Sequence, residues 1–123
     1  RARKAYPPYP NTQHTSTTHL PLKDNSTDKV FAILSAHEIR NHEERVSFFK
    51  EIHRVLSATG QIIVTEHLRD TANFLAYNIG AFHFHSRTTW LKTFKSAGLR
   101  VADEIKITPF ITTFILDKNG TAS

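Results

Sequence analysis

Two short, almost uninterrupted apolar runs, at residues 29–34 and 61–65, limit what this chain can fold into more than any other feature. Runs of this kind are typical of strands buried on both faces, as in a parallel sheet covered by helices. Between them, apolar residues recur at spacings of three and four over residues 41–57, which predicts a helix with one buried stripe. We therefore expect a right-handed crossover unit whose two strands are adjacent, parallel and central in the sheet.

The predicted helix carries signals at both ends. Asn41 can cap its first turn, and Glu44 can reach back to the amide of the cap, which is the reciprocal arrangement of a capping box. Gly60 is expected to end the helix in a left-handed conformation.

The second half of the chain continues the alternation of helix and strand. Residues 70–77 predict a short helix, and a longer one is expected between a cap at Ser86 and a stop at Gly98. Residues 101–107 and 110–117 are rich in β-branched and aromatic residues, and the short turn between them forces antiparallel pairing. The fold class is therefore α/β, with a sheet that ends in an antiparallel hairpin.

Composition excludes several classes of protein. The 123 residues suit one domain, and with no cysteine the chain has no disulfide, thiolate metal site or cysteine nucleophile. No apolar run approaches the roughly 20 residues of a membrane span, so we expect a soluble, cytoplasmic protein. The net charge of +5 comes from scattered side chains, which makes nucleic acid an unlikely partner. The chain has no Met and opens on Arg1, and we interpret it as a piece of a longer protein.

Three segments in series carry a resemblance to a known family. They read LPLKDNSTDKV at residues 20–30, SAHEI at 35–39 and FKEIHRVLSATG at 49–60. This series resembles the carboxyl-terminal half of class I S-adenosylmethionine-dependent methyltransferases of the small-molecule type often called type 11. The resemblance extends over about residues 13–117, because that fold also ends in an antiparallel hairpin.

The resemblance implies a partial Rossmann-like methyltransferase sheet that lacks its N-terminal strands. Residues 1–123 would be the C-terminal part of a single methyltransferase domain, with an irregular linker and third-strand region at 1–27 and the α/β core at 28–123. Residues 1–6 would be the tail of the helix before the third strand. The four glycines form no G-x-G, so the family's Gly-rich cofactor loop is absent. We expect the isolated chain to be inactive and to bind S-adenosylmethionine weakly or not at all. The full-length parent protein is expected to bind this cofactor.

Cofactor-binding candidates follow from the same resemblance, because the cofactor of this fold lies across the carboxyl ends of the strands. Ser35, Ala36 and His37 follow the first apolar run and would line the methionine side of the cofactor. Ser16 and Thr17 would face its adenine. The alternatives are a plain strand-to-helix connector for the first group and ordinary turn residues for the second.

Catalytic and substrate-binding candidates lie on the same rim. Glu66 and His67 follow the second apolar run and, with His37, could bind the substrate or accept its proton. Arg69 could bind the substrate as well, although it could equally belong to the start of the next helix.

His83 and His85 alternate with aromatic residues, and a period of two points both imidazoles the same way. They could bind a metal with Glu38 or His37, but the sequence lacks a helical pair at i and i+4 or a third ligand at fixed spacing. We therefore predict no metal site and interpret residues 81–85 as a lid or pocket wall that contacts the substrate.

Two functions remain open on the sequence. The first is a fragment of a methyltransferase that acts on a small-molecule acceptor. The alternative is a non-enzymatic remnant or interaction module, which binds a partner through an open sheet edge or its basic surface. Such an edge, beside the strand at 30–34, would face either a missing neighbour or a second copy of the chain, and we expect self-association there.

Overall fold

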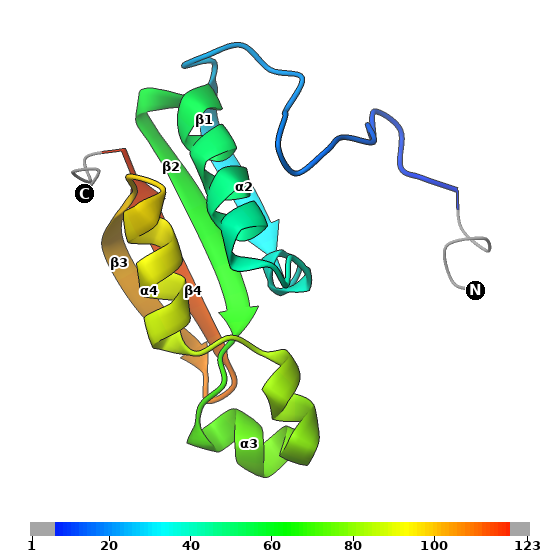
Figure 1. Cartoon of the computed structure of the whole chain (residues 1–123), viewed down its shortest axis with the longest axis vertical. Coiled ribbons are helices and arrows are strands. Elements are labelled where there is room, and N and C mark those ends of the chain that lie inside the picture. The colour runs from blue at the N-terminus through cyan, green and yellow to red at the C-terminus, as the bar shows by residue number, and fades with distance from the viewer. Residues whose placement is uncertain (1–6, 119–123) are drawn as a thin grey trace.

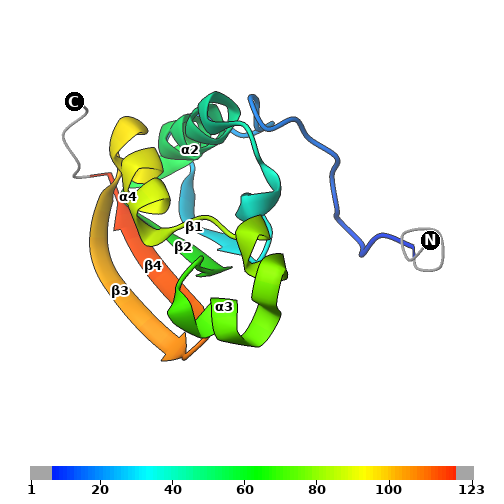
Figure 2. The same cartoon turned by 60° about the horizontal axis from the view of Figure 1, so that its bottom comes forward.

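The computed structural model describes residues 7–118, which form one four-stranded sheet with helices on one face (Figures 1 and 2). The strand order is β1-β2-β4-β3. β1 and β2 are parallel, whereas β4 is antiparallel to both β2 and β3. Residues 1–6, expected to be the tail of a helix, lie outside the described part. The strands are β1 (Thr27–Ile33), β2 (Leu56–His67), β3 (Arg100–Thr108) and β4 (Ile111–Asp117); the helices are α2 (His42–Val55), α3 (Thr71–Tyr77) and α4 (Arg87–Ser96), with short 3-10 helices η1 (Ala36–Glu38) and η2 (Asn78–His83).

The expected parallel pairing of the two strands is confirmed, but the expectation that both strands are central in the sheet is wrong for the first of them. β1 and β2 are adjacent and parallel, and β4 lies antiparallel on the other side of β2, as the resemblance implied. β2 is therefore central, but β1 is the edge strand of this sheet. Among residues 7–26, which include part of the expected third-strand region, the only pairing is an isolated bridge between Ser16 and His19, so no described strand covers the outer edge of β1.

Among residues 7–118, helices cover only one face of the sheet, which corrects the expectation that both apolar runs are buried on both faces. α2 and α4 pack on one face (Figure 2). There an aromatic core of Phe49, Trp90, Phe94 and Phe114 is fully buried. Alternate residues of β1 point away from those helices, and Phe31 and Ile33 are 64% and 58% exposed.

The ends of α2 follow the sequence signals in part. The side chain of Asn41 accepts a hydrogen bond from the Glu44 amide at 2.9 Å, as expected of a cap. The Glu44 carboxylate accepts from the Thr17 hydroxyl at 2.7 Å, in place of the expected bond to the cap. At the other end, Leu56 leaves the helix in an extended conformation and begins β2 directly, so Gly60 lies inside a strand and has no positive φ.

The expected elements of the second half are confirmed. Asp70 caps α3, and Ser86 caps α4 through the Thr89 amide. Gly98 has a φ of 77°, the left-handed conformation that ends a helix. The hairpin of β3 and β4 forms with the predicted antiparallel pairing. Within residues 7–118, no helix is long and apolar enough to cross a membrane.

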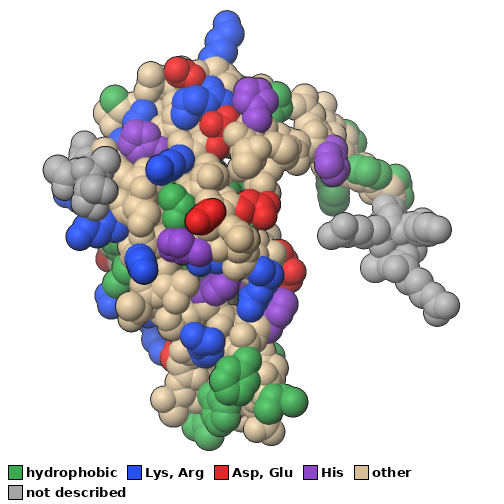
Figure 3. All heavy atoms as spheres, in the orientation of Figure 1, with side chains coloured by type: hydrophobic (Ala, Val, Ile, Leu, Met, Phe, Trp, Pro, Cys, Tyr) green, Lys and Arg blue, Asp and Glu red, His purple; other side chains and the backbone are tan. Residues whose placement is uncertain are grey.

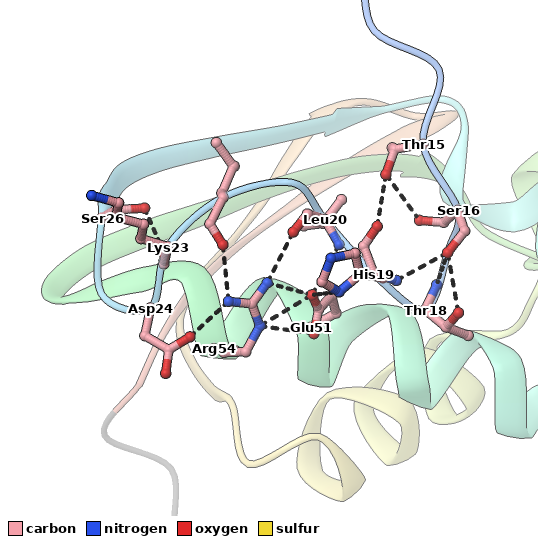
Figure 4. Close-up of polar contacts among 11 residues, drawn as sticks. Thr15, Ser16, Thr18, His19, Leu20, Lys23, Asp24, Ser26, Glu51 and Arg54 are labelled. Carbon is pink, nitrogen blue, oxygen red and sulfur yellow. Dashed lines mark hydrogen bonds and ion pairs between the residues drawn. The ribbon is translucent and has the colours of Figure 1, made fainter.

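Arg54 of α2 makes several bonds that hold the irregular N-terminal segment against this helix (Figure 4). Arg54 donates to the carbonyl oxygens of Leu20 and Leu22 at 3.0 and 2.9 Å and to Asp24 at 2.7 Å. It is itself held by Glu51, whose pKa falls to about 2 because Arg54 donates to the carboxylate. Since the loop leads directly into β1, these bonds fix where that strand begins.

Substitution of Gly60 tests the close packing at the start of β2. A Cβ atom at Gly60 would lie 2.7 Å from Cδ1 of Leu56, which is fully buried and has little room to move. We expect Gly60→Ala to lower the free energy of unfolding by about 1–3 kcal/mol in urea denaturation. At Gly80 the nearest atom would be 3.7 Å away, so Gly80→Ala should change that free energy by about 0.5 kcal/mol or less. Equal effects of the two substitutions would contradict this account.

Candidate functional site

The carboxyl ends of β1 and β2 meet at one edge of the sheet, where the Leu34 amide donates to the Thr65 carbonyl at 2.8 Å. The next residue of β2, Glu66, is fully buried. Its Oε1 accepts hydrogen bonds from three successive backbone amides, those of Ser35, Ala36 and His37, at 3.1, 2.8 and 3.3 Å. A fully buried carboxylate thus holds the chain where it turns from β1 into η1.

The other oxygen of Glu66 fixes the His37 ring. His37 Nδ1 lies 2.7 Å from Glu66 Oε2. Because the carboxylate only accepts, the proton of that bond belongs to Nδ1, and Nε2 is left to face outward. Nε2 lies 3.2 Å from Oε1 of Glu38. Two sequence candidates, His37 and Glu66, are therefore brought into direct contact.

His67, at the end of β2, has an equally defined orientation. Its Nδ1 lies 2.9 Å from the Phe110 carbonyl and 3.2 Å from Oδ1 of Asn73. Both partners are acceptors, since the Asn73 amide nitrogen is engaged with Asp70 and Phe110, so the network assigns the proton to Nδ1. No hydrogen-bond partner of His67 Nε2 is found within residues 7–118. This nitrogen is a free acceptor at the rim.

Aromatic rings connect the two histidines. Phe84 stacks on His67 at a centroid distance of 4.9 Å and meets His37 edge-on at 6.2 Å. Tyr77 packs against both His67 and Phe84. We call His37, Glu66, His67 and Phe84 the rim cluster. The sequence does not predict that Phe84 connects the two histidines, because the alternation of residues 82–85 indicates only a pocket wall. It does not predict the contact of Asn73 with His67 either, since the only signal at Asn73 is its spacing from the cap at Asp70.

The period of two expected for His83 and His85 does not hold in the structure. η2 covers residues up to His83, so the period of two does not apply there. His83 Nε2 lies 3.3 Å from Oε1 of Glu38, and His85 Nε2 lies 3.3 Å from a guanidinium nitrogen of the buried Arg45. Burial, together with the charge of Arg45, lowers the pKa of His85 to about 4, which keeps its ring neutral.

Ser16, Thr17 and Arg69 have partners outside the rim cluster, whereas the amides of Ser35 and Ala36 bind Glu66. The Ser16 hydroxyl accepts from the amides of Thr18 and His19 in a local turn, and Thr17 binds Glu44. The backbone amide of Arg69 donates to the His85 carbonyl at 2.9 Å, which ties α3 to the segment before α4. Ser35 is exposed, and its side chain makes no capping bond.

Two surface features lie apart from the rim cluster. A hollow of about 300 Å³ on the α2–α4 face is lined by His42, Glu43, Val46, Ser47, Lys50 and Ser96. Exposed apolar side chains gather over α3 and η2, at the lower end in Figure 3, and include Phe74, Leu75, Tyr77, Ile79 and Phe82. Lys and Arg side chains on the face in Figure 3 are interspersed with acidic ones rather than gathered into a stripe.

Replacement of Glu66 tests its hold on the η1 turn. Glu66→Gln keeps the shape but removes the charge that three amides and one imidazole share. We expect the free energy of unfolding to fall by about 1–3 kcal/mol. The ¹⁵N shifts of the His37 ring should also show the proton moving away from Nδ1. As a control, Glu44→Gln replaces an exposed acid and should leave the free energy of unfolding and the His37 shifts nearly unchanged. Unchanged ¹⁵N shifts of the His37 ring in Glu66→Gln would contradict the assignment of the proton to Nδ1.

The pH dependence of stability tests the environment of His85. Its pKa is about 4 in the folded chain against an ordinary 6.5, so the folded state binds fewer protons between these values. The contribution of neutral His85 to the free energy of unfolding is therefore fully present above about pH 6.5, and it is lost as the pH falls towards 4. After allowance for solvent screening, we expect the free energy of unfolding to fall by about 1–2 kcal/mol over this range. Urea denaturation at several pH values measures this change. His85→Gln should flatten that slope, whereas His14→Gln, at an exposed histidine, should not; equal slopes in both variants would refute the assignment.

Comparison with solved structures places this arrangement among known folds. The chain is similar to an S-adenosylmethionine-dependent methyltransferase from Aquifex aeolicus, with a TM-score of 0.72 at 16% identity over 86% of this chain and 53% of that one. It is also similar to one from Leishmania major, with a TM-score of 0.64 at 19% identity over 84% and 43%. The [4+2]-cyclase SpnF matches with a TM-score of 0.69 at 17% identity over 89% and 56%. At these identities the likeness shows the fold alone, and the chain spans about half the length of the structures it matches.

Comparison by sequence supplies the family. No curated protein matches. The sequence model of the type 11 family, described as a methyltransferase domain, matches residues 1–64, which is 64 of 123 residues. With the two neighbours named as S-adenosylmethionine-dependent, this match supports S-adenosylmethionine as the cofactor. The family model covers more than half of the sequence and the fold agrees with it, so the chain belongs to the methyltransferase domain family.

Proposed function

We propose that this chain is the C-terminal part of a cytoplasmic methyltransferase domain that transfers a methyl group from S-adenosylmethionine to a small-molecule acceptor. The observation that carries the proposal is the turn from β1 into η1, which Glu66 holds at the carboxyl end of a parallel strand pair. Ligands of open α/β sheets bind outside such ends. The family to which the chain belongs supplies the reaction class.

The chain's residues fit one side of the cofactor. Ser35 offers an exposed hydroxyl beside the turn, and His37 presents its ring there. The amides of residues 35–37 are already engaged by Glu66, so they would shape the wall of the site rather than bind the cofactor's carboxylate. Ser16 and Thr17 stay candidates for the adenine side. The chain has no G-x-G loop for the methionine portion, and we propose that other residues of the parent protein supply those contacts.

S-adenosylmethionine supplies an activated methyl group when it is bound, so the protein's task is mainly to orient the acceptor and exclude water. Among the catalytic candidates, His67 is best placed to accept a proton, because its Nε2 is free while Nδ1 is fixed by Phe110. Glu66 has both oxygens occupied in a buried position, which suits a positioning residue. Arg69, His83 and His85 are proposed to border the acceptor, with Phe84 as the apolar wall.

A second candidate function is an interaction module, favoured by one observation. No described strand pairs with the outer edge of β1, and Phe31 and Ile33 are mostly exposed. An unpaired apolar edge favours association, because its amides and carbonyls need partners. Sedimentation of the isolated chain at micromolar concentration tests this reading. A dimer would support it, and a stable monomer with no partner would exclude it.

Cofactor binding tests the first proposal. We expect the parent protein to bind S-adenosylmethionine in calorimetric titration, and the isolated chain to bind it more weakly by about one to six powers of ten. Two or three polar groups of the cofactor would lose water there without a partner, at a cost of roughly 1–3 kcal/mol each.

Matched variants of the parent protein locate the site. Ser35→Trp should abolish binding by filling the space beside the turn, whereas Ser47→Trp, at an exposed serine of the α2–α4 hollow, should not. A parent protein that fails to bind the cofactor would refute the function. Micromolar binding by the isolated chain would refute the proposal that residues of the parent protein outside this chain supply part of the cofactor site.

A further inference from the structure

Three side chains with metal-ligating atoms converge beside the rim cluster. Oε1 of Glu38 lies 3.2 Å from Nε2 of His37 and 3.3 Å from Nε2 of His83. All three ligand atoms lie within 4.8 Å of one another. From this geometry we propose that His37, Glu38 and His83 bind a divalent transition-metal ion, for which Zn²⁺ is the natural probe. The proposal goes beyond methyl transfer and does not depend on it.

The spacing of the atoms suits a tetrahedral ion. With bonds of about 2.0–2.1 Å to nitrogen and oxygen, neighbouring ligand atoms of tetrahedral zinc are separated by about 3.3 Å. The two His–Glu distances have this length already. Only the separation of the two imidazole nitrogens has to adjust, and the His83 side chain, which is 50% exposed, lies at the surface where such a small shift is least restricted.

The surroundings of His37 are those of a metal ligand. A ligating histidine commonly donates its second ring N–H to a carboxylate, which fixes the tautomer and makes the outer nitrogen a better ligand. Glu66 does this for His37 at 2.7 Å, from a fully buried position. The arrangement was not evident in the sequence, because Glu66 is 29 residues from His37 and is brought there by the pairing of β1 with β2.

The second histidine is also held in place by the fold. His83 comes from η2, 45 residues from Glu38. The side chain of Arg40 donates to the backbone carbonyls of both His37 and His83, so it clamps the two segments together. Its positive charge and that of the neighbouring Arg45 oppose a cation, and the two carboxylates of Glu38 and Glu66 balance them. Two imidazoles and one carboxylate favour transition metals over Mg²⁺ or Ca²⁺, and three protein ligands leave a coordination position open.

Calorimetric titration of the metal-free protein with ZnCl₂ tests the proposal, with Co²⁺ absorption as a second probe of coordination. We expect one equivalent of Zn²⁺ to bind and visible Co²⁺ bands typical of tetrahedral nitrogen and oxygen ligands. His83→Ala and Glu38→Gln should each weaken binding by more than tenfold. Both side chains are at least half exposed, so these variants should fold, as circular dichroism would verify.

Two further variants separate this site from adventitious binding. His14→Ala removes an exposed histidine elsewhere and should leave the affinity unchanged. Glu66→Gln touches no ion but should weaken binding about 10- to 100-fold through His37. Absence of saturable Zn²⁺ binding, or equal affinity of His83→Ala and His14→Ala, would overturn the proposal. Neither outcome bears on methyl transfer, because no cofactor or acceptor is present in the assay.

Discussion

A buried carboxylate organises the functional end of this fold. Glu66 is the last inward-facing residue of β2, and it enters the space beneath the end of β1. Such a charge would be costly without partners, but three amides and one imidazole surround it. The same bonds set the path of the chain from β1 into η1, the tautomer of His37, and through His37 the position of Glu38. The parallel pairing of β1 with β2 therefore determines, through one side chain, how the groups at the rim are arranged.

The sequence predicts the elements better than their surroundings. Periodicity and caps locate α2 and α4, and the two apolar runs pair as expected, because local propensity and burial agree there. The runs also suggest burial on both faces, yet Phe31 and Ile33 are exposed, since only one face of the sheet is covered by described residues. The role of Gly60 is likewise misread. A glycine after a helix favours a left-handed stop, whereas here it makes room for the Leu56 side chain.

The sequence predicts that the site residues lie at the rim of the sheet, but it does not predict which groups they contact. That His37, Glu66 and His67 lie near strand ends follows from the alternation of elements. That Glu66 binds the amides of residues 35–37 depends on tertiary contacts between distant segments, and the sequence named Glu38 only as one possible partner of His83. Fold likeness adds little here, because the structural neighbours include both methyltransferases and a [4+2]-cyclase. Function has to be argued from the site.

The most direct measurement is a crystal structure of the parent protein with S-adenosylhomocysteine, the cofactor product. The account predicts that the sulfur atom of the ligand lies beside residues 35–37 at the carboxyl end of β1, with Glu66 still bonded to their amides beneath it. A ligand bound elsewhere on the domain, or a Glu66 side chain released from those amides and turned towards solvent, would contradict the account.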